Sequence, residues 1–276
     1  MKYYHIEVNI KTNNKSPYFV GSMIRGAFGY GLKKVTCINP SFNCEGCFAQ
    51  SSCLFYEFYE AKNILHKYRF DIKLGSNNFD FGLYIFDNSC DKLPYILSAL
   101  EMTLKKIGMG KDNLKFDNIE IFLNQQSIYE KNKFLPFDIS PKKIEIENSN
   151  PNIKIKLLTP LRIKKNNKLV KDSIEIEDIL RSIYQREQEI FYDKKVFRLE
   201  YKPTYVTKIS TINHKTLIRK SNRQKVKMNM DGIMGEIAII GIDKESYRLL
   251  KIGEIIGVGK QCVFGLGKIE IVDIRD

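Results

Sequence analysis

The sequence contains no tryptophan and only three histidines among its 276 residues. It also lacks any run of about 18 uncharged apolar residues, the length that a membrane-spanning helix needs. The first seven residues do not form the apolar core of a secretory signal peptide, so we expect a cytoplasmic protein with no membrane partner. Hydrophobic residues make up 43% of the chain, which excludes intrinsic disorder as its main state.

Acidic residues are outnumbered, with 32 Asp and Glu against 45 Lys and Arg, a formal net charge of +13. Such an excess favours an anionic partner such as nucleic acid, although an AT-rich genome would also enrich lysine. Two windows, residues 148–171 and 201–230, contain no acidic residue at all. Genome bias would scatter lysines among the acids, so these windows indicate a locally positive surface for nucleic acid.

Cysteine is scarce outside one segment, where Cys37, Cys44, Cys47 and Cys53 fall within 17 residues in the pattern C-x6-C-x2-C-x5-C. A C-x2-C pair brings two thiolates to one metal from a single turn, and two further thiolates complete an S4 shell. Zinc and an iron–sulfur cluster both remain open. Redox-active thiols and disulfides are the alternatives, and disulfides are disfavoured in a chain without an export signal. We expect Cys90 and Cys262 to be isolated structural residues.

The first half shows the periodicity of an α+β domain. Alternating apolar residues predict strands over 4–10, 68–74, 79–85 and 116–123, and helical spacing predicts helices over 19–35 and 93–107. The resulting order, β-α-β-β-α-β, is the ferredoxin-like unit that RNA-recognition motifs also use. The sequence lacks the aromatic-rich segment with which those motifs stack bases, so we do not expect stacking of that kind.

The second half repeats this order. We expect a strand over 153–157, a helix over 179–191 that begins near an N-cap at Asp172–Ser173, extended segments over 201–212 and 233–240, a short helix over 247–252 and a strand over 269–272. The predicted fold is therefore α+β, with two tandem ferredoxin-like, RRM-like domains. The first spans residues 1–145 with the cysteine cluster inserted at 37–53, and the second spans 151–276 with a glycine-rich loop at 253–267.

That loop holds five of the 17 glycines, at Gly253, Gly257, Gly259, Gly265 and Gly267. It matches neither the Walker A pattern nor G-x-G-x-x-G. Its backbone amides, beside Lys260 and Lys268, are suited to a close approach to phosphates. A glycine-rich turn that leads into the last strand explains the composition equally well.

From this loop outward, the sequence resembles a known family. Residues 232–239, 249–254 and 257–268 closely resemble the C-terminal domain of a CRISPR-associated endoribonuclease of the RAMP superfamily. Residues 158–162 and 221–224 resemble two further segments of that family. Residues 24–29, the four cysteines and the segment from Glu57 to Glu60 resemble its N-terminal region.

The resemblance implies binding of CRISPR repeat RNA and one metal-independent cut in each repeat of the precursor crRNA. The 2′-hydroxyl of the RNA would be the nucleophile, no catalytic cofactor would be needed, and the product would end in a 2′,3′-cyclic phosphate. This chemistry requires a base, an acid and a cation, for which His, Tyr and Lys are the usual groups.

The candidate catalytic residues depart from the family pattern, because Gly257 occupies the place where relatives commonly have a histidine before Val-Gly-Lys. His214, inside the second acid-free window, is the best remaining base, and we expect structural roles for His5 and His66. Tyr30 with Lys33 is the alternative catalytic set, although packing in the core is the expected role of Tyr30. The predicted RNA contacts are Arg25, Lys34, Lys215, Arg219, Lys220, Arg223, Gly257, Gly259, Lys260, Gly265, Gly267 and Lys268.

Two functions from different classes follow. One is the endoribonuclease, acting as a monomer or homodimer. The other is a non-catalytic RNA-binding RAMP subunit that holds a guide RNA together with other CRISPR effector subunits, which the missing loop histidine favours. A redox role for the cysteines is disfavoured, because an S4 site has no open coordination position.

Overall fold

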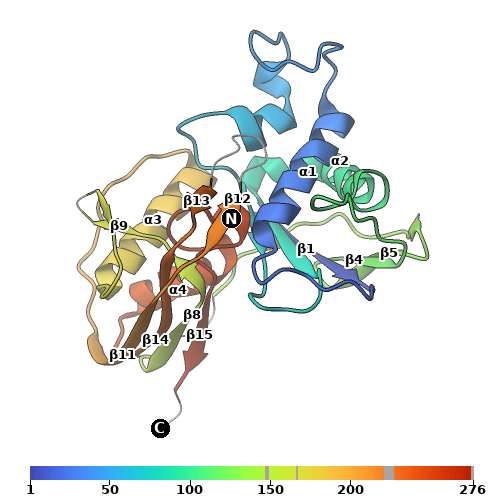
Figure 1. Cartoon of the computed structure of the whole chain (residues 1–276). Coiled ribbons are helices and arrows are strands. Elements are labelled where there is room, and N and C mark those ends of the chain that lie inside the picture. Colours follow the sequence, from blue (N-terminus) through green and yellow to red (C-terminus); the bar gives the residue numbers. More distant parts are fainter. Residues whose placement is uncertain (147–148, 166, 221–226, 275–276) are drawn as a thin grey trace. The chain divides into compact units, whose positions relative to one another are not determined.

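The structure is a computed structural model that describes residues 1–146, 149–165, 167–220 and 227–274. The chain divides into two compact units, Met1–Lys143 and Ile144–Asp276 (Figure 1). Each unit has its own antiparallel sheet. Among the described helices, none is long and apolar enough to cross a membrane.

The first unit has the predicted β-α-β-β-α-β order. Its elements are β1 (Lys2–Ile10), α1 (Gly21–Thr36), β2 (Tyr68–Asp71), β3 (Phe81–Phe86), α2 (Leu93–Glu101) and β4 (Ile119–Leu123). The strands are ordered β2-β3-β1-β4, and every pair is antiparallel. This is the ferredoxin-like arrangement, which confirms the predicted fold class.

Shorter elements complete this unit. They are η1 (Gln50–Ser52), η2 (Tyr56–Glu60), η3 (Asp87–Lys92), η4 (Met102–Ile107), β5 (Gln126–Glu130), β6 (Lys133–Phe134) and β7 (Lys142–Lys143). β5 and β6 extend the sheet beyond β4, and β7 pairs with the start of β1. The helices α1 and η4 cross closely at Gly31 of α1. A Cβ atom there would lie 2.1 Å from the Oγ1 atom of Thr103 in η4, so only glycine fits.

The second unit repeats the order. Its elements are β8 (Ile153–Leu161), α3 (Ile176–Tyr192), β11 (Val206–Lys215), β14 (Gly232–Ile240), α4 (Lys244–Ile256) and β15 (Ile269–Asp273). The strand order β11-β14-β8-β15 is again fully antiparallel. Alternate residues of the inner strands are buried, among them Ile153, Ile155, Ile237 and Ile239, as their period of two predicts. The chain therefore contains tandem ferredoxin-like folds.

Two small hairpins and one short helix of this unit were absent from the sequence prediction. β9 (Lys164–Lys165) pairs with β10 (Lys168–Leu169), and β12 (Ile218–Lys220) pairs with β13 (Lys227–Asn229). The short helix η5 (Cys262–Phe264) lies within the glycine-rich loop. Strands of two or three residues carry too little periodicity to be recognised in a sequence.

The predicted start of the second-unit helix is wrong. α3 begins at Ile176 after Glu175, and no side chain caps its first turn, so Asp172–Ser173 is not its N-cap. The helix begins where the buried positions begin, at Ile176, Ile179 and Leu180. Burial of an apolar face has set this end rather than a local capping residue.

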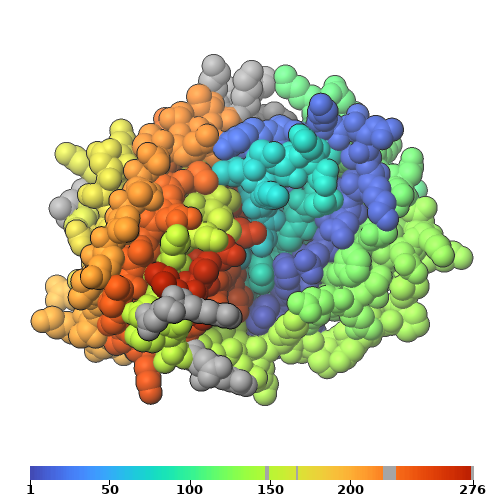
Figure 2. All heavy atoms as spheres, turned by 90° about the horizontal axis from the view of Figure 1, so that it is seen from below, coloured from blue at the N-terminus to red at the C-terminus, as the bar shows by residue number. Residues whose placement is uncertain are grey.

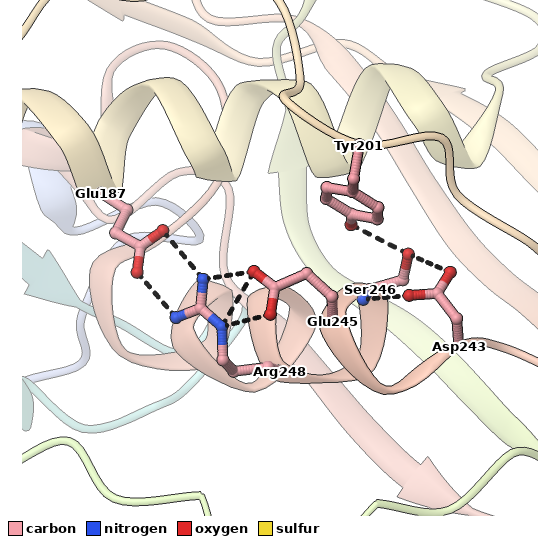
Figure 3. A network of polar contacts seen from close by, with 6 residues as sticks. All are labelled: Glu187, Tyr201, Asp243, Glu245, Ser246 and Arg248. Atoms are coloured by element: carbon pink, nitrogen blue, oxygen red, sulfur yellow. Dashed lines mark hydrogen bonds and ion pairs between the residues drawn. The ribbon is translucent and has the colours of Figure 1, made fainter.

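A polar network joins α3 to α4 (Figure 3). The Arg248 guanidinium in α4 donates to both carboxylate oxygens of Glu187 in α3, at 2.8 and 3.3 Å, and also to Glu245. Ser246 Oγ donates its one proton to Asp243 (2.8 Å). The hydrogen bond between Tyr201 and Ser246 Oγ (2.9 Å) is therefore donated by the Tyr201 hydroxyl. Burial alone would raise the pKa of Asp243, but hydrogen bonds from Thr204 and Ser246 hold this pKa below its usual value.

Candidate nucleic-acid interface

The glycine-rich loop leaves α4 at Gly257 and returns to the sheet at β15. The predicted start of the loop at Gly253 is wrong, because Gly253 lies in the last turn of α4 and is buried there. Gly267 has a φ of +69°, and a Cβ atom there would lie 1.8 Å from the Val258 carbonyl oxygen. Gly259 has a φ of +77°, and its Cβ atom would lie 2.6 Å from the Arg162 carbonyl oxygen. These two glycines let the loop fold back on itself and pack against the end of β8.

The amides of this loop are bonded within the fold. Gly259 N donates to Ser182 Oγ (2.9 Å), Gly267 N to the Pro160 carbonyl (3.1 Å), Gly257 N to the Gly253 carbonyl and Gly265 N to the Cys262 carbonyl. Lys260 N likewise donates to the Arg162 carbonyl, and Lys268 N donates to Thr159 Oγ1. The expectation that these amides face phosphates is therefore wrong. The loop offers an anion its lysine side chains, of which Lys260 is exposed and Lys268 half-buried.

Two residues of α3 that the sequence analysis missed hold the loop in place. The buried Arg186 side chain donates to the carbonyls of Ile256 (2.7 Å), the last residue of α4, and of Gly257 (3.0 Å), which follows it. Ser182, one helical turn earlier on the same face, accepts from Gly259. The only feature of the sequence that pointed to this role is that Ser182 and Arg186, four positions apart, are polar residues among the apolar positions of the helix.

The β12–β13 hairpin contacts this loop. The Arg219 guanidinium lies 4.4 Å from the centroid of the Phe264 ring, a cation–π contact. At the end of β8, Arg162 donates to the Asp231 carbonyl, and burial lowers the pKa of its guanidinium despite the nearby Asp231 carboxylate. The structure thus places the Arg219 guanidinium against the glycine-rich loop, which also carries Lys260. The predicted contact Arg223 lies outside the described residues, and Lys220 is placed only as the last residue of β12.

His214 and Lys215 end the edge strand β11, which pairs with β14 in the sheet. The side chain of His214 is exposed, and that of Lys215 is half-buried. Most of β11 lies at the surface, where the orange part of the chain is visible in the space-filling view (Figure 2). His214 is therefore accessible to a large substrate.

The acid-free windows are only partly a positive surface. Lys154 pairs with Glu236 of β14 (3.0 Å), and Lys156 pairs with Glu270 of β15 (3.1 Å). Neighbouring strands thus supply the acids that the sequence window lacks. The inference of a locally positive surface from residues 148–171 is wrong for these two lysines.

The first unit carries the other candidates on α1. Tyr30 is 64% exposed, so the expectation that it packs in the core is wrong. Lys34 is also exposed, and its Nζ atom lies 4.9 Å from the centroid of the Phe42 ring. Lys33 lies over Phe55 at 5.0 Å. Tyr30 and Lys34 share one helix face at a spacing of four residues.

Arg25, one of the predicted RNA contacts, is half-buried in the first unit. Its guanidinium lies 4.5 Å from the centroid of the Tyr59 ring, and the Tyr59 hydroxyl donates to the Arg25 carbonyl (2.7 Å). Burial raises the pKa of Tyr59 well above its usual value, and the charge of Arg25 opposes that shift. Arg25 is thus held against Tyr59 within the first unit, and its contact with RNA stays a prediction.

The other two histidines occupy structural positions, as expected. His66 Nδ1 lies 2.9 Å from the Glu57 carbonyl, and burial lowers the pKa of His66. The His5 ring stacks on Tyr84, with 4.2 Å between centroids. Both rings are held by neighbours, which leaves His214 as the exposed histidine.

The four clustered cysteines line one small cavity, and all six cysteines are free thiols. Across the residues that the structure describes, no group of three or more His, Cys, Asp or Glu side chains is placed as metal ligands are. Cys90 and Cys262 are buried singly and donate to backbone carbonyls, which agrees with the structural roles predicted for them.

Family models match both halves of the chain. Residues 1–143, more than half of it, match AF_1859_N, the model of an N-terminal domain. Residues 155–269 match the model described as CRISPR-associated endoribonuclease Cas6. The site therefore lies in the second of two ferredoxin-like units, the part of the chain that matches the Cas6 model. The chain belongs to the AF_1859_N family.

Individual relatives are distant but span the whole chain. An uncharacterized protein of Archaeoglobus fulgidus is 25% identical over 286 aligned residues, with 91% of each chain covered. Two Cas6 product complexes superpose with TM-scores of 0.58 and 0.53 at 12% identity; they cover 99% and 98% of this chain and 100% of their own. A Cas6-related protein from Pyrococcus furiosus superposes at 0.50, with 12% identity and 99% of each chain covered. At such identities the likeness shows a shared fold.

Proposed function

We propose that the protein binds CRISPR repeat RNA and processes the precursor crRNA by a metal-independent cut. The observation that carries this proposal is the match of residues 155–269 to the Cas6 endoribonuclease model. The matched segment contains the glycine-rich loop and the β12–β13 hairpin, which meet through Arg219 and Phe264. Exposed Lys260 and the Arg219 guanidinium at this junction provide positive charge for an RNA backbone.

The proposed reaction needs no group beyond the RNA and protein side chains. The 2′-oxygen attacks the adjacent phosphorus, the bond from phosphorus to the 5′-oxygen breaks, and a 2′,3′-cyclic phosphate and a 5′-hydroxyl are formed. A base takes the proton of the 2′-hydroxyl, and an acid protonates the departing 5′-oxygen. His214 is the proposed base because it is the exposed histidine within a basic strand. Tyr30 and Lys33 are the alternative set.

A second candidate function is a non-catalytic RNA-binding subunit of a CRISPR effector complex. It is favoured by Gly257, which is buried, has a φ of +76° and stands at the place where the family that the sequence resembles commonly has histidine. A histidine with that backbone conformation would be strained. The loop in this chain is therefore built without the usual catalytic side chain.

The test is a cleavage assay with repeat RNA from the host's own CRISPR array, carried out in EDTA. We expect a single cut that leaves a 2′,3′-cyclic phosphate. As a control, a repeat RNA with a 2′-deoxy nucleotide immediately 5′ of the cut should bind and remain intact, because the nucleophile is missing. Tight binding without cleavage of the unmodified RNA would establish the carrier instead, and absence of binding would contradict both functions.

A second prediction concerns the position of the RNA. Replacing Lys215, Lys260 and Lys268 together by Gln should flatten the plot of log affinity against log salt by about 2, because each lost contact to a single strand removes about 0.7 from the slope. The comparison is the pair Lys154→Gln and Lys156→Gln, whose lysines pair with Glu236 and Glu270 on neighbouring strands and are not among the predicted contacts. Equal slopes for wild type and the triple variant would place the RNA elsewhere.

A further inference from the structure

The segment Cys37–Cys53 has no hydrophobic core of its own. None of its 17 residues, all of which the structure describes, is buried. Its larger apolar side chains point to solvent, with Ile38 exposed by 69% and Phe48 by 76%. Regular structure within it is limited to the three-residue turn η1. A loop of this length in a compact unit needs some other means of holding one shape.

The four thiols are what the folded segment brings together. Cys37 follows the last turn of α1, and the others are linked by successive turns: Cys47 N donates to the Cys44 carbonyl, Gln50 N to the Cys47 carbonyl and Cys53 N to the Gln50 carbonyl. Gly46, with a φ of +66°, allows the tight turn between Cys44 and Cys47. All four cysteines line a cavity of about 20 Å³.

The size and charge of this cavity limit what it can hold. A volume of about 20 Å³ accommodates one water-sized group, which suits a single ion. Lys33 carries its positive charge near Cys44, where it would offset part of the negative charge of four thiolates around a divalent cation.

We propose that Cys37, Cys44, Cys47 and Cys53 bind one zinc ion as a tetrathiolate that holds this segment in shape. Zinc fits because it takes four thiolates in a closed tetrahedral shell and needs no redox partner. Binding releases the four thiol protons. Drawing each sulfur to about 2.3 Å from the ion requires the turns to close inward, which the segment can do because no buried side chain anchors it. This proposal is independent of RNA cleavage.

The test is zinc analysis of the full-length protein after incubation with Zn²⁺ and removal of unbound ions. We expect about one zinc per chain, together with protection of four thiols from a thiol reagent. Cobalt in place of zinc should give the visible bands of a tetrahedral thiolate site. The proposal would be overturned if fewer than about 0.1 zinc ions were bound per chain. A disulfide found by mass spectrometry, or bound iron with sulfide, would overturn it as well.

Variants separate this site from adventitious binding. Cys44→Ser and Cys53→Ser should each lower zinc affinity at least tenfold, whereas Cys90→Ala, which changes a buried cysteine elsewhere in the same unit, should keep the wild-type stoichiometry. If the serine variants bound zinc as tightly as wild type, the four-cysteine site would be refuted. If they failed to fold, the zinc content and cobalt spectrum of the wild type would still decide the question.

Discussion

Replacement of His214 by alanine should lower the rate of repeat-RNA cleavage by about 10²- to 10⁴-fold, the usual contribution of a general base. Affinity for the RNA should be retained, because the positive groups around the glycine-rich loop are unchanged. His214 lies at the exposed end of β11, so its removal leaves no cavity in the core. The measurement is single-turnover cleavage in EDTA alongside a binding titration.

Two comparisons make this result specific. His5→Ala removes a histidine that stacks on Tyr84 and should cleave as wild type does. Tyr30→Phe, which removes only an exposed hydroxyl, tests the alternative set on α1. Cleavage retained in His214→Ala and lost in Tyr30→Phe would transfer the catalytic role to the first unit. Cleavage retained in both would show that neither residue is the base.

Replacement of Arg248 by methionine should lower the free energy of unfolding by about 3–5 kcal/mol, because it leaves the carboxylate of Glu187 buried without its cation. The Glu187 side chain is only 3% exposed, and Arg248 holds both of its oxygens. Urea unfolding at neutral pH would measure the loss. Glu245→Gln should cost less than about 1 kcal/mol, because Glu245 is an exposed partner of the same arginine.

The double variant Glu187→Leu with Arg248→Met gives the decisive comparison. It replaces the buried ion pair by apolar side chains, so it should recover most of the stability lost in the single variant. If the double variant were as unstable as Arg248→Met alone, the cost would come from lost packing of the arginine stem instead. Since α3 also holds the glycine-rich loop through Arg186, weaker α3–α4 packing should reduce RNA affinity as well.

The order and type of the main elements could be predicted because burial imposes a period on the sequence. In β1, for example, Tyr4, Ile6, Val8 and Ile10 are all buried. The start of α3 could not be predicted, because Asp172 and Ser173 have the character of capping residues and the packed face begins only at Ile176.

The site was harder to predict because its parts come from distant segments. The β12–β13 hairpin reaches the glycine-rich loop through Arg219, which is 45 positions from Phe264, and no local pattern indicates that pairing. The roles of Arg186 and Ser182 depend on where α4 ends. The same reason explains the error over Lys154 and Lys156, whose acidic partners lie on other strands. The net charge of a sequence segment therefore does not give the net charge of the surface that the folded sheet presents.

The close contacts at Gly259 and Gly267 have a consequence for how such chains diverge. Both positions exclude a side chain for reasons of backbone geometry, whether or not RNA is ever cut. A lineage that abandoned cleavage and kept only RNA binding would therefore retain these glycines, while its catalytic side chains were free to drift. The glycine signature accordingly reports the architecture of the loop and not the activity of the protein.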